Sequence, residues 1–122
     1  MDKNALEAII TQAKQAAAAA AQAYVDNWTA ETGGNQYGEP MYCGYAWVYI
    51  NKHNGIAIKG NTKLGRAMKA AGVEQDYTRA FRIHDPSGWG GQSMDVKQAG
   101  AQAAVKVFVS YGFEASAGGH AD

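Results

Sequence analysis

Apolar residues recur along this chain with two different spacings. In residues 3–27 they return every three or four positions, which is the spacing of one face of an α-helix. In residues 42–50 strand-forming residues follow one another without a break, and successive side chains of a strand point to opposite faces. The pattern therefore predicts an amphipathic N-terminal helix, then a strand that is apolar on both faces.

The predicted N-terminal helix carries a stripe of mainly small residues, which consists of Leu6, Ile9, Ile10, Ala13, Ala17, Ala20, Tyr24 and Trp28. Alanine favours the helix, and its short side chain lets another element approach closely. The stripe therefore either packs inside its own chain or joins the helices of two subunits as a homo-oligomer. Residues 29–41 hold three glycines and Pro40, which predicts a linker and makes residues 1–28 an N-terminal amphipathic helical arm.

The strand at 42–50 divides its side chains between an aliphatic face and an aromatic face. The aliphatic face holds Gly44, Ala46, Val48 and Ile50, and the aromatic face holds Cys43, Tyr45, Trp47 and Tyr49. Small and aliphatic side chains suit a closely packed helix, whereas the aromatic face needs cover from the arm, a partner or a ligand. We favour cover by the arm, and we expect mid-strand Trp47 to be required for stability.

The rest of the chain alternates between strand and helix signals. In order they are a hairpin turn at Asn54-Gly55 with a return strand at 56–59, a helix over 62–71, a strand over 77–85, a helix over 94–110 and a strand over 113–117. Asn61 or Thr62 is the expected cap of the first of these helices, and Ser93 of the second. This order predicts an α/β (α+β) two-layer sandwich over 42–118, in which a small sheet of three to four strands carries helices on one face. Residues 119–122 are predicted to form a tail.

The predicted strand at 77–85 supplies possible neighbours for the aromatic face. Its alternation points Tyr77, Phe81 and Ile83 inward and Arg82 and His84 outward. Several small folds use aromatic side chains flanked by cations on an exposed sheet to stack the bases of single-stranded nucleic acid. The candidate binding residues on the aromatic sheet face are therefore Tyr45, Trp47, Tyr49, Arg82 and His84.

Two helix starts are preceded by glycine, at 59–63 and at 85–93, and helix N-termini favour anions. If both point to the same edge of the sheet, they form one phosphate-binding rim of Asn61, Thr62, Lys63, Arg66, Ser87, Gly88, Gly90, Gly91 and Ser93. Neither segment matches the G-x-G-x-x-G or Walker pattern. Simple helix capping at 61–62 and a tight turn around Trp89 are the preferred explanations.

Composition narrows the class of protein. At 122 residues with 47% hydrophobic content, the chain fits a single core. Cys43 is the only cysteine and has no CxxC or Cys/His pattern around it, so we expect no disulfide, metal site or cofactor. No apolar run reaches the length of a membrane span, and the first residues lack the pattern of a signal peptide. A soluble, cytoplasmic protein is expected.

The distribution of charge and the candidate nucleophiles give little support to a nucleic-acid binding protein or to an enzyme. The formal net charge is zero, although residues 51–82 carry seven Lys or Arg against two acidic residues, so an ordinary solvated surface accounts for the cluster. Cys43 lies in a strand, Ser87 lacks a nucleophile-elbow context and His84-Asp85 is only a dipeptide. We therefore expect a protein that is not an enzyme.

Several short motifs resemble a family of small uncharacterised proteins encoded by tailed bacteriophages. They are Cys43-Gly44-Tyr45-Ala46-Trp47-Val48, Gly60-Asn61-Thr62-Lys63-Leu64-Gly65, Pro86-Ser87-Gly88, Gln92-Ser93-Met94-Asp95-Val96-Lys97 and Ala99-Gly100-Ala101. The likeness covers about residues 42–117, and family members also begin with an alanine-rich helix. Many of them end in Ser-Arg-x-Asp, where this chain has Gly119-His120-Ala121-Asp122. The resemblance implies a phage origin and brings no known activity with it.

Together these features suggest a non-enzymatic phage accessory protein in the host cytoplasm. On this hypothesis it binds a host or defence protein, as a counter-defence factor would, through the aromatic face or the arm. Two alternatives remain open: a nucleotide or single-stranded nucleic-acid binding protein that uses the glycine-rich helix starts and the aromatic face, and a minor virion component. Phosphate binding weakens steeply with added salt, which distinguishes the first alternative.

Overall fold

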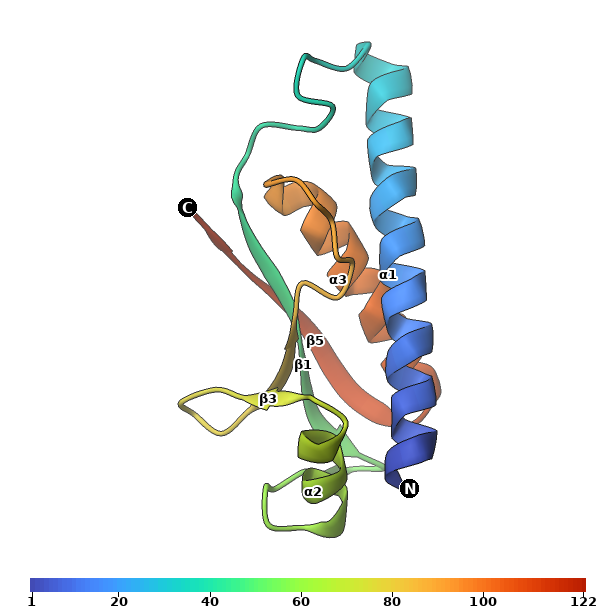
Figure 1. Ribbon diagram of the computed structural model, residues 1–122, viewed down its shortest axis with the longest axis vertical. Helices are drawn as coiled ribbons and strands as arrows, with labels where there is room; N and C mark the ends of the chain where they lie inside the picture. The colour runs from blue at the N-terminus through green and yellow to red at the C-terminus, as the bar shows by residue number, and fades with distance from the viewer.

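Three helices and a five-stranded antiparallel sheet make up residues 1–122 in the computed structural model (Figure 1). The elements are α1 (Lys3–Thr32), β1 (Gly44–His53), β2 (Ile56–Ala57), α2 (Lys63–Ala70), β3 (Glu74–Gln75), β4 (Phe81–His84), α3 (Met94–Ser110) and β5 (Phe113–Ala121). The predicted α+β class, with helices packed against a small sheet, is confirmed. The sheet has five strands instead of three to four, because the two-residue β3 carries no periodic signal.

Strand β1 lies at the centre of the sheet and is paired on both sides. β5 runs antiparallel along one side, from Gly44 opposite Ala121 to His53 opposite Phe113. On the other side β1 pairs with β4 and then with β2, and β3 extends the sheet beyond β4. The predicted hairpin turn is confirmed, since Asn54-Gly55 has φ values of 50° and 79°, and two-residue turns of this kind require positive φ at both positions.

Helix α1 is longer than predicted and its buried side follows a different track. It continues to Thr32 and ends at Gly33, which has a left-handed φ of 82°. Beyond Ala17 the buried residues are Ala21 and Val25, and not the predicted Ala20, Tyr24 and Trp28. Steps of four residues exceed the helical repeat of about 3.6, so the buried stripe winds around α1 as it crosses α3.

Both long helices lie on the aliphatic side of the sheet (Figure 1). Ala46, Val48 and Ile50 of β1 have no exposed surface, and they share one hydrophobic cluster with the first half of α1 and with Ala101, Ala104 and Phe108 of α3. The alanine stripe of α1 therefore packs inside its own chain, which is the first of the two interpretations. Ala13 and Ala17 are buried there and are not available to a second subunit.

The prediction of a strand over 77–85 is wrong for its first four residues. β4 begins only at Phe81, and Tyr77 is 97% exposed on the turn that joins β3 to β4 instead of facing inward. The Asp76 carboxylate accepts hydrogen bonds from the backbone N–H groups of Thr78 at 2.8 Å and Ala80 at 3.1 Å. An aspartate that bonds forward in this way closes a tight turn, which prevents a continuous strand.

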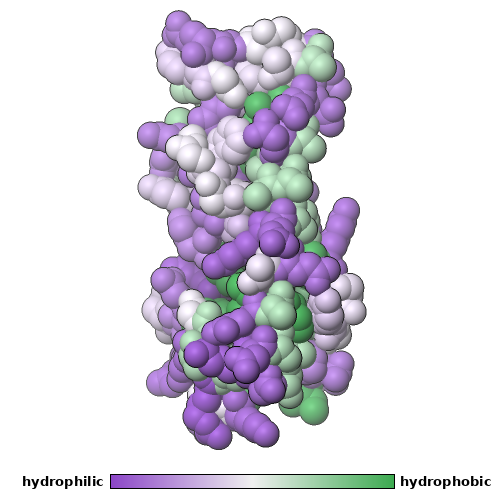
Figure 2. Space-filling view, turned by 45° about the vertical axis from the view of Figure 1, so that its right-hand side comes forward, coloured by the Kyte–Doolittle hydropathy of each residue, from purple (hydrophilic) through white to green (hydrophobic).

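The helical side of the molecule shows little strongly hydrophobic surface. With the α1 side turned toward the viewer, most visible residues are hydrophilic or weakly hydrophobic, and strongly hydrophobic ones appear only as small patches (Figure 2). No helix, not even the 30-residue α1, is both long and apolar enough to cross a membrane.

Replacing Gly100 by alanine should lower the free energy of unfolding. A Cβ at Gly100 would lie 2.6 Å from Cβ of Ser87 and 3.1 Å from the carbonyl oxygen of Ala17, where α3 approaches α1. Overpacking of this severity costs about 3 kcal/mol, which outweighs the roughly 1 kcal/mol that alanine gains over glycine in a helix. Urea denaturation measures the difference. Gly90→Ala is the control, because a Cβ at Gly90 would have no neighbour within 4 Å. Equal stability of Gly100→Ala and wild type would contradict the close helix contact.

Candidate binding surface

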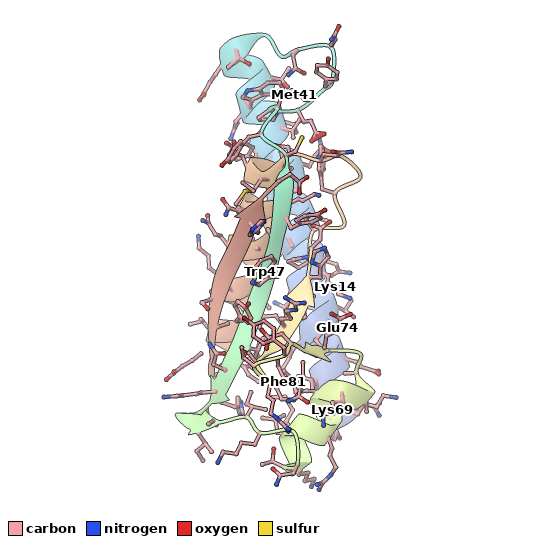
Figure 3. All side chains as sticks on the ribbon, turned by 90° about the vertical axis from the view of Figure 1, so that its left-hand side faces the viewer. Lys14, Met41, Trp47, Lys69, Glu74 and Phe81 are labelled. Atoms are coloured by element: carbon pink, nitrogen blue, oxygen red, sulfur yellow. The ribbon has the colours of Figure 1, made fainter.

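No helix covers the aromatic face of β1. In Figure 3 the sheet faces the viewer with Trp47 on it, and α1 lies behind. Tyr45 is 44% exposed and Trp47 and Tyr49 are half-buried, whereas Ala46 and Val48 on the other face are fully buried. The expected cover by the N-terminal arm is therefore wrong, because α1 packs on α3 at the opposite side of the sheet.

Strand β4 brings the two predicted cationic neighbours onto this face. Trp47 is paired with His84, and Tyr49 with Arg82. The guanidinium carbon of Arg82 lies 5.7 Å from the centre of the Trp47 ring, and the rings of Tyr45 and His84 are 5.8 Å apart. Trp47 also meets Tyr49 edge to face, with ring centres 6.1 Å apart. All five predicted surface residues thus form one connected cluster.

Strand β5 adds residues that the sequence did not indicate. Ser116, Gly118 and His120 stand opposite the three aromatic residues in the register with β1. Gly118 leaves room for Trp47, since a Cβ at this position would collide with the indole Nε1. These residues were missed because the glycine pair at 118–119 suggested that the strand had already ended. The only signal for a longer strand was a run without proline up to residue 122.

The outer side of β5 is a free edge of the sheet. This nine-residue strand pairs only with β1, and Figure 3 shows it at the left-hand border of the sheet. It contains no proline and a single carboxylate, Glu114. Unpaired N–H and C=O groups along such an edge can accept a further strand. The cluster of aromatic and cationic side chains therefore adjoins an edge that can pair with another polypeptide.

The two glycine-containing helix starts lie far apart along the molecule, so the predicted shared rim is wrong. α2 follows the hairpin at the lower end of β1 in Figure 1, whereas α3 follows β4, which runs antiparallel to β1 and ends higher up. Asn61, Thr62, Lys63 and Arg66 are therefore separated from Ser87, Gly88, Gly90, Gly91 and Ser93. Both β2 and β4 run antiparallel to β1, so the separation comes from their positions along it: β2 pairs only with Lys52 and His53, whereas β4 reaches Trp47.

The start of α3 is occupied by a carboxylate of the chain itself. Glu39 is 8% exposed, and its two carboxylate oxygens accept hydrogen bonds from Trp89 Nε1 at 3.0 Å and from the backbone N–H groups of Gln92 at 2.9 Å and Ser93 at 2.8 Å. Ser93 is the N-cap residue as predicted, but its side chain makes no capping hydrogen bond. Gly91 is needed here, because a Cβ at this position would collide with the carboxylate. The anion expected at this helix start is thus Glu39.

The environment of Glu39 keeps it ionised. Burial is the largest single influence and raises its pKa, but the hydrogen bonds from Trp89, Gln92 and Ser93, with the positive charge of Lys97, together lower the pKa below the ordinary value of 4.5. Trp89 also packs against the buried cluster of Ala21, Val25 and Val96. Trp89 is therefore a structural residue, contrary to the expectation that only Trp47 would be one, and the stabilising role expected of the half-buried Trp47 stays a prediction.

The other candidate groups serve local structure. Thr62 Oγ1 accepts a hydrogen bond from the Gly65 N–H at 3.1 Å, which confirms the predicted cap of α2. Ser87 Oγ donates to Asp85 at 2.8 Å and accepts from the Trp89 N–H at 3.1 Å, so it shapes the turn before α3. Cys43 is a free, half-buried thiol, and no three His, Cys, Asp or Glu side chains come together as a metal site would require.

Comparisons of this chain with protein-family models, with curated proteins and with solved structures found no match.

Replacing Glu39 by glutamine should destabilise the fold at neutral pH by about 1–3 kcal/mol, because buried N–H donors lose a charged acceptor. A carboxylate whose pKa is lowered by folding stabilises the protein above its unfolded-state pKa, and this contribution is lost as the pH falls through the lower folded-state value. The difference in the free energy of unfolding between wild type and Glu39→Gln should therefore disappear below about pH 4. Urea denaturation at a series of pH values measures it.

Glu31→Gln is the matched control, because Glu31 is exposed near the end of α1 and forms no ion pair. Its free energy of unfolding should stay close to that of wild type at every pH. A Glu39→Gln protein as stable as Glu31→Gln at neutral pH would show that the carboxylate does not hold the start of α3.

Proposed function

We propose that this protein acts by binding and not by catalysis, and that the aromatic sheet face is its binding surface for a protein partner. The observation that carries the proposal is the cluster of Tyr45, Trp47 and Tyr49, over which no helix packs, although Lys97 of α3 places its Nζ 5.6 Å from the centre of the Tyr45 ring. Exposed aromatic clusters of this kind on a folded domain typically mark interaction sites.

The make-up of the face favours a protein as the partner. Tyrosine, tryptophan and arginine are the residues most enriched among those that dominate protein–protein binding energy. Here Trp47 is fixed by Arg82 on its ring face and by Tyr49 at its edge. Side chains that are already held in place lose little conformational entropy on binding, which favours affinity.

The free edge of β5 supports the same choice. A peptide strand added beside β5 would pair its backbone with the unpaired N–H and C=O groups and place alternate side chains next to His120 and Ser116. A nucleic acid has no backbone N–H groups for such pairing. The adjoining edge therefore fits an extended polypeptide segment better than a nucleotide chain.

The resemblance to phage proteins suggests where the partner comes from. A small phage-encoded binding protein that works in the host cytoplasm would take a host or defence component as its target. If the protein were instead a minor virion component, it would be found in purified particles and would contact another structural protein. Mass spectrometry of purified virions separates these two cases.

Single-stranded nucleic acid is the second candidate ligand, and the position of Arg82 over Trp47 favours it. Bases stack on aromatic rings, and flanking cations contact the phosphates. Against it, the lower end of the face carries carboxylates: Glu74 is paired with Arg82 in the register of β3 and β4, and Glu114 lies 3.9 Å from Lys52. This mixed charge is less favourable for a polyanion.

Capture from infected host lysate tests the proposal. Immobilised wild type, treated with nuclease, should retain a defined partner, and the double variant Tyr45→Ser/Trp47→Ser should lose it, with binding weakened by at least about 30-fold because central aromatic residues contribute about 2 kcal/mol or more. The matched control is Tyr24→Ser, since Tyr24 of α1 is 38% exposed against 44% for Tyr45. Tyr24→Ser should bind as wild type does.

Two results would contradict a protein partner on this face. One is retention that disappears with nuclease and falls steeply with salt, which would indicate nucleic acid. The other is retention that survives in the double variant but is lost in Tyr24→Ser, which would place the binding surface on α1. Circular dichroism of each variant confirms that the fold is intact before binding is compared.

A further inference from the structure

A second surface, independent of the aromatic face, lies at the α2 end of the molecule. A cleft of about 780 Å³ opens between the loop after β2, helix α2 and the turn that joins β3 to β4. Four basic side chains line it, Lys59, Arg66, Lys69 and Arg79, and no acidic side chain does. We call it the basic cleft, and Figure 3 shows Lys69 at this end of the molecule.

The basic cleft is held in shape by contacts around two glycines. A Cβ at Gly65 would collide with the carbonyl group of Lys59, so the first turn of α2 lies directly against this loop. Thr62 closes the same loop, because its Oγ1 donates to the Lys59 carbonyl at 2.6 Å. At Gly60 a Cβ would lie 2.9 Å from Lys69 Nζ and 3.1 Å from the Gln75 amide oxygen. Glycine at this position therefore leaves room for Lys69 and Gln75 to converge.

Hydrogen bonds to backbone carbonyls position two of the four cations. Arg66 donates from Nη1 to the carbonyl of Asn61 at 2.6 Å, and Lys69 donates from Nζ to the carbonyl of Gly60 at 3.3 Å. Gln75 donates from Nε2 to the carbonyl of Arg79 at 3.0 Å, which ties the turn to the cleft. Each side chain keeps further N–H donors, since a guanidinium has five and an ammonium three.

No basic side chain of the cleft forms an ion pair within the chain. The two ion pairs of the molecule are Lys3 with Glu7 and Lys52 with Glu114, and neither involves a residue of the cleft. Four like charges around one cavity repel one another, and an anion bound among them removes that repulsion. Guanidinium groups bind phosphate oxygens in pairs, and ammonium groups bind them as point charges.

We propose that the basic cleft binds the linked phosphates of a small ligand, such as a diphosphate or the phosphate chain of a nucleotide. Two or more phosphates match four cations better than a single one does. The start of α2 is not what creates the site, because Thr62 already accepts the Gly65 N–H there. The site consists of side chains from three segments that the fold brings together.

Inorganic pyrophosphate is the probe, and thermal unfolding at low salt is the first measurement. At a hundredfold excess over its Kd, pyrophosphate should raise the Tm of wild type by about 5–15 °C. Lys69→Gln and Arg79→Gln should each weaken binding by roughly 10- to 100-fold, because each removes charged hydrogen bonds to the ligand. Lys63→Gln is the matched control, since Lys63 lies on the same helix but does not line the cleft, and it should bind as wild type does.

Further titrations distinguish which kind of phosphate-bearing ligand the cleft binds. Titration with a nucleoside triphosphate should reproduce the effect of pyrophosphate, whereas equal ionic strength of sodium chloride should not. No change in Tm with pyrophosphate, or the same change in wild type, Lys69→Gln and Arg79→Gln, would overturn the proposal. So would a single-stranded oligonucleotide that binds through these residues while pyrophosphate does not, because the ligand would then be a nucleic-acid backbone.

Discussion

The close packing of α3 between the sheet and α1 is the constraint on which the rest of the structure depends. Gly100 of α3 lies against Ala17 of α1, and Ala101 and Ala104 lie in one core with Ala46 and Val48 of β1. Small residues allow these approaches, and no larger side chain would fit at Gly100 without displacing a neighbour. Because this arrangement places both long helices on one side of β1, its aromatic face is left open.

A second contact, between Glu39 and the start of α3, fixes the upper part of the molecule in Figure 1 and also occupies a helix start that could otherwise bind an anion. The N–H groups at the start of α3 would attract an external anion if they were free. Glu39 reaches them from the segment between α1 and β1 and takes their hydrogen bonds itself. This segment is therefore more than a linker, since it joins the end of α1 to the start of α3. Binding of phosphate is consequently better sought near α2, where four basic side chains from three segments line a cleft.

The sequence predicted what depends on local pattern and failed where distant segments meet. The two faces of β1 were assigned correctly, because side chains of a strand alternate regardless of context. Which element covers a face depends on tertiary packing, and there the prediction of cover by α1 was wrong. Glu39 was missed because its partners lie 53 and 54 positions away and a single glutamate in a glycine-rich segment has no pattern. The shared rim failed for a related reason, since the place where β2 and β4 each pair along β1 decides where α2 and α3 begin.

The zero net charge conceals a separation of charge along the molecule. Asp26 and Glu31 lie near the upper end of α1 in Figure 1, whereas the basic cleft lies near α2 at the lower end. The field of these separated charges orients an approaching anion toward the cleft even though the whole chain is neutral. Net charge alone therefore underestimates the positive charge that gathers at one end of this molecule, and the proposed phosphate site lies at that end.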